Sequence, residues 1–159
     1  MKELLIAIVT WLSVNFGLPP DYDLPKVSRF PNTELAEIHY RGVEPSKRRK
    51  VVAVYHDATE TILLSDSWTG RSPADLSVVV HEMVHHLQKR ANLRFECATA
   101  REKQAYAAQE AWLRLFGRNL GSEFNIDKMT LKLATTVKPP FYVPILERVS
   151  GTGGRMLRA

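Results

Sequence analysis

The residues best suited to chemistry form a short cluster near the middle of the 159-residue chain, His81-Glu82-Met83-Val84-His85. Two histidines four positions apart lie on one face of a helix, so both imidazoles can reach one metal ion. Zinc binds such nitrogen ligands at about 2.0–2.1 Å in tetrahedral geometry. Glu82 lies beside that face, where its carboxylate can take a proton from a zinc-bound water. The H-E-x-x-H pattern therefore predicts one zinc ion held by His81 and His85, with Glu82 as the general base.

A catalytic zinc site needs a third protein ligand and leaves its fourth position for water. No histidine follows His86 in the chain, so a downstream carboxylate is the natural candidate. Glu102 is the first choice, because the small Ala105 on the same helix face would let two helices approach closely. Glu96 is the alternative, although it stands where that helix is only beginning.

Two further side chains near this cluster have open interpretations. Tyr106, four positions after Glu102, could hydrogen-bond a ligand or stabilise a developing oxyanion, and is a candidate catalytic residue. The competing interpretation is a half-buried helix tyrosine. His86 must point about 100° around the helix from His85. We expect it to support the site or to lie at the surface rather than to bind the metal.

Two helices are expected to carry these residues. Ser72, Pro73 and Asp75 together make a strong helix start, since serine can cap, proline suits the first helical position and aspartate occupies the capping-box site. A helix is therefore predicted over residues 73 to about 90. Its centre is apolar on nearly every side, which is typical of a buried helix. An alanine-rich second helix is predicted from about residue 96 to residue 116, before Gly117.

The remaining pattern predicts a small sheet and accessory helices. Alternating or apolar runs predict strands over residues 36–41, 51–55 and 61–64, with a hairpin loop at residues 56–60. We therefore expect a mostly antiparallel sheet and an α+β fold. An amphipathic helix is expected near the N-terminus, ending by residues 15–17, then an extended connection over residues 18–33, which hold four prolines. A short helix is expected over about residues 125–135.

The H-E-x-x-H helix and the later Glu102-Lys103-Gln104-Ala105-Tyr106 run resemble the gluzincin branch of the zincin metallopeptidases, and its minimal single-domain members in particular. The chain is also similar to a bacterial family of short proteins with H-E-x-x-H-H-x-Q followed by an E-x-x-A-Y helix. The resemblance covers roughly residues 50–116. It implies a small sheet over an active-site helix and a glutamate-bearing helix, with substrate paired to an edge strand. Larger gluzincins often have an aspartate where Tyr106 stands.

Length predicts one domain over residues 1–150, with a flexible tail over residues 151–159, and the resemblance implies that this domain is a zincin-like metallohydrolase. The lone Cys97 cannot form an intrachain disulfide and is expected to be a small buried residue. It fits a cytoplasmic location. Residues 4–12 are too short to span a bilayer. Their apolar character leaves export through an N-terminal signal segment as the alternative.

The residues favour a zinc-dependent metallohydrolase, and the resemblance implies a metallopeptidase acting on a peptide or protein substrate. The alternative is a non-catalytic zinc-binding interaction module. A DNA-associated regulator is less favoured, because the net charge of +5 is scattered apart from the run at residues 47–50. No aromatic side chains interleave with that run as stacking platforms would require. The sequence alone does not predict an oligomeric state.

Overall fold

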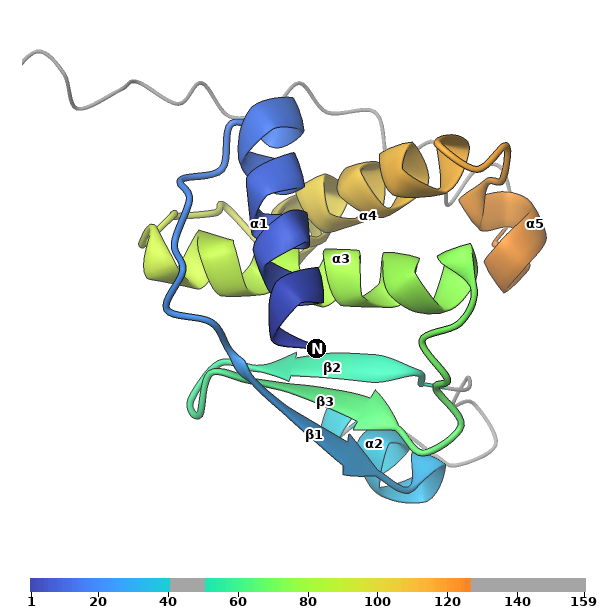
Figure 1. Cartoon of the computed structure of the whole chain (residues 1–159). Helices are drawn as coiled ribbons and strands as arrows, with labels where there is room; N and C mark the ends of the chain where they lie inside the picture. The colour runs from blue at the N-terminus through green and yellow to red at the C-terminus, as the bar shows by residue number, and fades with distance from the viewer. Residues whose placement is uncertain (41–50, 127–159) are drawn as a thin grey trace, which may run out of the picture.

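The computed structural model describes residues 1–40 and 51–126, and its architecture is α+β (Figure 1). The elements are, in chain order, α1 (Lys2–Phe16), β1 (Lys26–Phe30), α2 (Asn32–His39), β2 (Ala53–His56), β3 (Thr61–Ser65), α3 (Pro73–Arg90), α4 (Ala98–Arg114) and α5 (Leu120–Phe124). The helix expected over residues 73 to about 90 is confirmed. The alanine-rich helix is confirmed with slightly shorter bounds. Helix α1 is also confirmed, and it ends at Gly17, whose φ of 63° suits glycine.

The sheet has three strands in the order β1-β3-β2. The predicted hairpin is confirmed, because β2 and β3 pair antiparallel with Ala53 opposite Leu64 and His56 opposite Thr61. The prediction of a mostly antiparallel sheet was wrong, since β1 pairs parallel to β3 and the sheet is mixed. All five residues of β3 are buried, as expected for the central strand.

The strand predicted over residues 36–41 was also wrong, because α2 occupies Asn32–His39. Pro31 precedes the helix and Glu34 lies in its first turn, where an acidic side chain is favourable. Leu35 is fully buried, and Ile38 follows it at helical spacing. Over so few residues, alternation and helical periodicity cannot be told apart. Strand β1 lies within the stretch expected to be an extended connection.

The sheet separates two hydrophobic clusters. Ile62 and Leu64 of β3 belong to the larger cluster, which includes residues of α1, α3 and α4. Leu63, between them, belongs to a smaller cluster with residues of α2. This alternation follows from the two-residue period of a strand. Helix α3 therefore lies between the sheet and α4, and α1 runs across α3 on the same side of the sheet, whereas α2 covers the opposite face (Figure 1).

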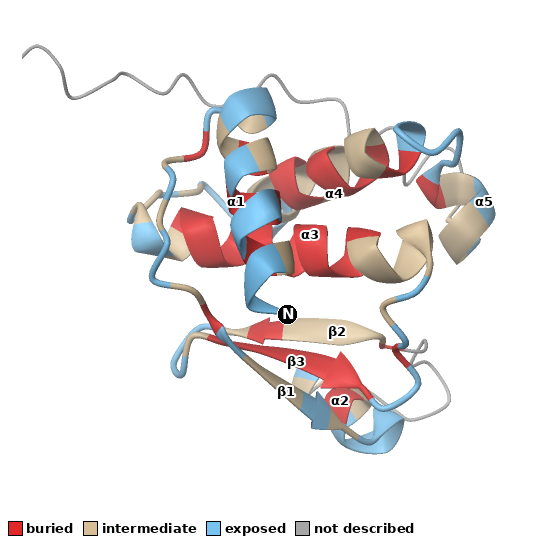
Figure 2. Ribbon diagram, in the orientation of Figure 1, coloured by how far each residue is buried: buried red, intermediate tan, exposed pale blue. Residues whose placement is uncertain are grey.

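Helix α3 is the most buried helix of the structure. The Ser72 hydroxyl accepts a hydrogen bond from the Asp75 N–H at 3.0 Å, so the predicted cap is present. Every residue from 77 to 88 is buried, as the red central turns in Figure 2 show. The fold thus places the H-E-x-x-H segment in the interior, where polar side chains need partners.

Several predicted features lie outside the described residues. They are the basic run at residues 47–50, most of the helix expected over residues 125–135, and the tail at residues 151–159. Within the described part of the chain, no helix combines the length and the apolar character that crossing a membrane requires.

Candidate metal centre

His81, His85 and Glu102 come together between α3 and α4. The Nε2 atom of His81 lies 3.1 Å from Oε2 of Glu102, and Nε2 of His85 lies 3.2 Å from Oε1. The two Nε2 atoms are 3.3 Å apart. One potential ligand atom from each of the three residues lies within 4.8 Å of the other two, and the cluster could hold a metal ion.

The spacing within this cluster fits a tetrahedral ion. Ligand atoms about 2.0–2.1 Å from a tetrahedral zinc lie about 3.3 Å from one another. The separation of 3.3 Å between the two Nε2 atoms agrees with that value, and each Nε2 lies 3.1 or 3.2 Å from a different oxygen of the Glu102 carboxylate. Two imidazoles and one carboxylate are also a donor set of catalytic zinc sites. Of the two carboxylates considered from the sequence, Glu102 is in the cluster. Glu96 is exposed and outside it.

The three side chains come from positions that their helices bring together. His81 and His85 are one turn apart on α3, so their rings lie close, with centroids 5.0 Å apart. Ala105, one turn beyond Glu102 on α4, is fully buried, and its small side chain permits the close approach of the two helices. Burial favours the neutral form of Glu102. Hydrogen bonds with the two imidazoles outweigh it and hold the pKa of this carboxyl well below its usual range.

Glu82 is buried beside the cluster. Its side chain lies away from water, and this burial raises the pKa of its carboxyl to about 7. The nearby His81 lowers that pKa, whereas the negative charge of Glu102 raises it. A backbone hydrogen bond from Tyr55 of β2 also favours the charged form. A carboxyl with a pKa near neutrality can both accept and release a proton, as a general base requires.

Both metal-facing histidines have a glutamine behind them. Nδ1 of His81 lies 3.1 Å from Oε1 of Gln109, and Nδ1 of His85 lies 3.1 Å from Oε1 of Gln88. The amide nitrogen of Gln109 donates to the Ser77 hydroxyl at 3.2 Å. Each imidazole is thus held at its far nitrogen, and its Nε2 faces the cluster.

Tyr106 and His86 take different places around the site. The Tyr106 ring packs edge-on against His81, with centroids 4.7 Å apart, and is half-buried. His86 points away from the cluster and is fully buried. There its Nε2 donates to the carbonyl of Asp23 at 2.9 Å, and its Nδ1 accepts from the hydroxyl of Tyr55 at 3.1 Å. His86 supports the fold beside the site, as one of the two interpretations of the sequence expected.

Comparison with known families shows the family of this chain. The model of a domain of unknown function, DUF6647, matches residues 1–139. The chain belongs to the DUF6647 family. Comparisons with curated proteins and with solved structures found no match. The matched span contains His81, His85 and Glu102 and the glutamines behind the two histidines, so the candidate site lies within the family's domain.

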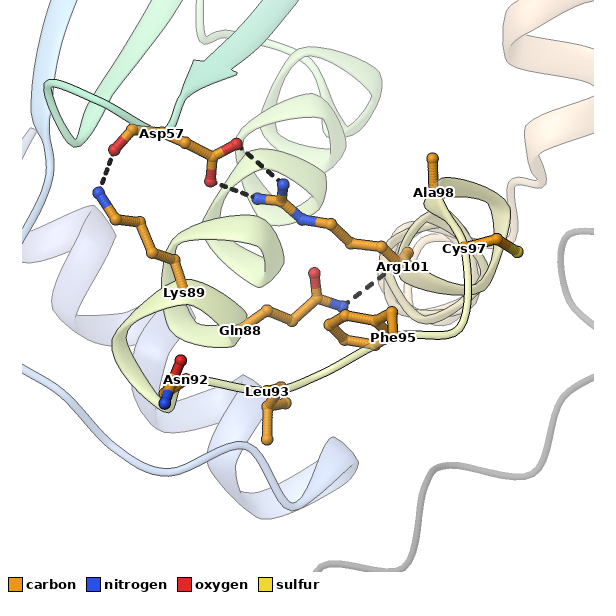
Figure 3. Close-up of a pocket in the computed structure, with 9 residues that line it drawn as sticks. All are labelled: Asp57, Gln88, Lys89, Asn92, Leu93, Phe95, Cys97, Ala98 and Arg101. Atoms are coloured by element: carbon orange, nitrogen blue, oxygen red, sulfur yellow. Dashed lines mark hydrogen bonds and ion pairs between the residues drawn. The ribbon is translucent and has the colours of Figure 1, made fainter.

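A cavity of about 420 Å³ opens beside the site of this DUF6647 domain (Figure 3). Gln88 lines it, so one wall of the cavity also contacts a candidate metal ligand. Its charged groups pair with one another, because Arg101 binds Asp57 through two hydrogen bonds of 2.7 and 2.9 Å. Cys97 also lines the cavity and is exposed, so its predicted burial was wrong. It lies at the N-cap of α4, outside the packed helix interface.

Sequence reasoning missed part of the hydrogen-bonding network in this DUF6647 domain. The sequence analysis gave no role at the site to Ser77, Gln88, Gln104 or Gln109. A weak signal was present, because Ser77 lies one turn before His81 on the same helix face. Their partners come from the other helix, which spacing along one helix cannot show.

Proposed function

We propose that this protein is a zinc-dependent metallohydrolase, and specifically a metallopeptidase. The observation that carries the proposal is the convergence of His81, His85 and Glu102 on one point beside the buried carboxyl of Glu82. A structural zinc site commonly has four protein ligands, whereas this cluster offers three and an adjacent base. Three ligands and a base are the composition expected of a hydrolytic site.

Each residue then has a defined task. The two imidazoles and the Glu102 carboxylate would hold the ion. A bound zinc ion supplies positive charge that activates water and polarises a scissile carbonyl. Glu82 takes the proton of the attacking water and delivers it to the departing amine, a transfer that its near-neutral pKa permits. Tyr106, against His81, is the candidate for stabilising negative charge on the substrate.

The edge of β2 offers a place for an extended peptide. The Ser65 N–H donates to the Val52 carbonyl, which sets the alternation of the antiparallel ladder. The backbone groups of Ala53 and Tyr55 therefore face away from β3, and β2 is an edge strand of the sheet formed by the described residues. Tyr55 uses this edge to hydrogen-bond Glu82. A peptide adding to the edge would lie next to the base, as the gluzincin resemblance also implies.

Metal analysis and hydrolysis assays on matched variants test the proposal. The purified wild-type protein should contain one zinc per chain and cleave members of a fluorogenic peptide library. Glu82→Gln should keep the zinc and lower kcat about 10²–10⁴-fold, the usual contribution of a general base. Glu96→Gln removes an exposed carboxylate of the same type and should leave both properties unchanged. Tyr106→Phe should keep zinc and lower kcat if its hydroxyl stabilises the oxyanion.

Two results would count against the proposal in different ways. Absence of zinc binding by the wild-type protein would overturn the metal site itself. Tight zinc binding without cleavage of any peptide, together with an unaffected partner interaction in Glu82→Gln, would instead support the non-catalytic interaction module.

A further inference from the structure

The hydrogen-bond chain behind His81 ends at a group that can only accept. The Ser77 hydroxyl donates to the carbonyl of Ala74 at 2.7 Å, which commits its single hydrogen. The same oxygen must therefore accept from the amide nitrogen of Gln109, 3.2 Å away. This fixes the orientation of the Gln109 amide, so its oxygen faces Nδ1 of His81 at 3.1 Å. An amide oxygen accepts only, and Nδ1 must carry the hydrogen.

A second chain behind His85 leads to the same result. The amide nitrogen of Gln88 lies 3.2 Å from the backbone carbonyl of Arg101 and 3.0 Å from Oε1 of Gln104. The Arg101 carbonyl cannot donate, so the nitrogen of Gln88 must face it. The amide oxygen of Gln88 is then directed at Nδ1 of His85, at 3.1 Å, and this Nδ1 also carries a hydrogen.

We infer that Gln109 and Gln88 are positioning residues which fix both imidazoles with Nδ1 protonated and the Nε2 lone pair directed at the ion. The inference rests on the proposed metal site. Two backbone carbonyls, those of Ala74 and Arg101, fix the orientation of the glutamine amides. The amides in turn determine which ring nitrogen of each histidine carries the hydrogen. Groups that orient metal-binding histidines in this way also raise the basicity of the ligand nitrogen.

Burial makes this orientation costly to reverse. Gln88 is 1% exposed, Gln109 is 5% exposed and Ser77 is fully buried, so water cannot easily replace a lost partner. Turning the Gln88 amide over would place its oxygen against the Arg101 carbonyl oxygen and leave an amide donor without an acceptor. A buried polar group without a partner is strongly unfavourable. The helices α3 and α4 thus fix the imidazoles before the metal arrives.

Zinc affinity, measured by competition with a chelator, tests the inference. Gln109→Met and Gln88→Met keep side-chain length but lose the acceptor, and each should weaken zinc binding about 10–100-fold. Lys103→Met is the matched control, because it places the same side chain on α4 at a residue outside the two hydrogen-bond chains, so affinity should hold. Gln109→Glu keeps an acceptor for Nδ1 and should retain affinity.

Nitrogen-15 NMR of the zinc-loaded wild-type protein gives a readout that needs no variant. It should show His81 and His85 with a protonated Nδ1 and a zinc-bound Nε2. Zinc on either Nδ1, or wild-type affinity in both folded methionine variants, would overturn the inference while leaving the metal site intact. A wild-type protein that binds no zinc would overturn the proposed function first. Circular dichroism identifies any variant that fails to fold, and NMR then decides alone.

Discussion

Among single side chains, Glu102 determines whether two neighbouring histidines become a metal site. It is the only carboxylate whose oxygens reach both Nε2 atoms among the described residues, at 3.1 and 3.2 Å. Glu102→Gln keeps the shape but removes the negative charge, leaving a neutral ligand set. Zinc affinity should fall by at least about 100-fold, the upper end of the loss seen for supporting residues.

Glu96→Gln provides the comparison for this prediction. Glu96 lies two residues before α4 begins and its side chain is exposed. Zinc titration of the two variants, followed by chelator competition, should therefore separate them clearly. Equal zinc affinity in Glu102→Gln and the wild-type protein would show that another group completes the site.

The candidate site was predictable to the extent that it depends on one helix. His81, Glu82 and His85 follow from spacing, and Glu102 followed from a face of the next helix with a small neighbour. The tasks of Gln88 and Gln109 could not be read in the same way. A glutamine amide packs, caps or orients a ligand according to its partners, and those partners lie across the α3–α4 interface.

Among the elements, β2 depends on α3 and α4 for its position over the site. Asp57, which follows β2, makes a two-bonded ion pair with Arg101 of α4, and its carbonyl accepts from Lys89 of α3 (Figure 3). Tyr55, two residues earlier, reaches Glu82. The end of the edge strand is therefore fixed to the two helices that carry the candidate ligands.

The Asp57–Arg101 pair predicts a pH-dependent contribution to stability. The hydrogen bond from Arg101 holds the pKa of the Asp57 carboxyl below its ordinary value of 3.8. Because the pKa of Asp57 is lower in the folded state than in the unfolded state, its charge stabilises the fold above pH 3.8. This contribution disappears as the pH falls through the pKa of the folded state. Because Asp57 is half-exposed, Asp57→Asn should cost at most about 1 kcal/mol at neutral pH.

Urea unfolding of both proteins at decreasing pH measures this contribution. The unfolding free energies of wild type and Asp57→Asn should converge as the pH falls below about 4. Asp66→Asn is the control, since it removes an exposed carboxylate that has no ion pair among the described residues. A difference between wild type and Asp57→Asn that stayed constant down to acid pH would rule out the charge of Asp57 as its source.

Some helices and strands could be predicted from the sequence and others could not. Helix α3 was predicted with its bounds because cap, proline and periodicity all agree there. Strand β1 was missed because it pairs parallel to β3, and each of its residues lies opposite one that is thirty-five positions later in the chain. No local turn joins two such strands, so no turn signal marks the pair in the sequence. Helix α2 was mistaken for a strand, because its eight residues carry too few periods to decide.

For the whole molecule, the candidate metal site connects two layers of the fold. His81 and His85 belong to the helix buried against the sheet, and Glu102 belongs to the helix packed on its other side. Without an ion, the cluster holds the Glu102 carboxylate next to two imidazoles, whose hydrogen bonds keep the pKa of Glu102 well below its usual range. A bound cation would satisfy all three groups at once. Metal binding should therefore stabilise the whole domain rather than one loop.

Removal of the metal tests this dependence. A ligand that binds only the folded state adds about 2.7 kcal/mol when its free concentration is a hundred times Kd. For a chain of this size that corresponds to a rise in Tm of about 5–11 °C. Zinc added to chelator-treated protein should produce this rise in thermal unfolding, and the same addition to His85→Ala should not. In His85→Ala, α3 contributes one imidazole and the site is incomplete. An equal rise in the Tm of this variant would therefore show that the stabilising ion binds elsewhere.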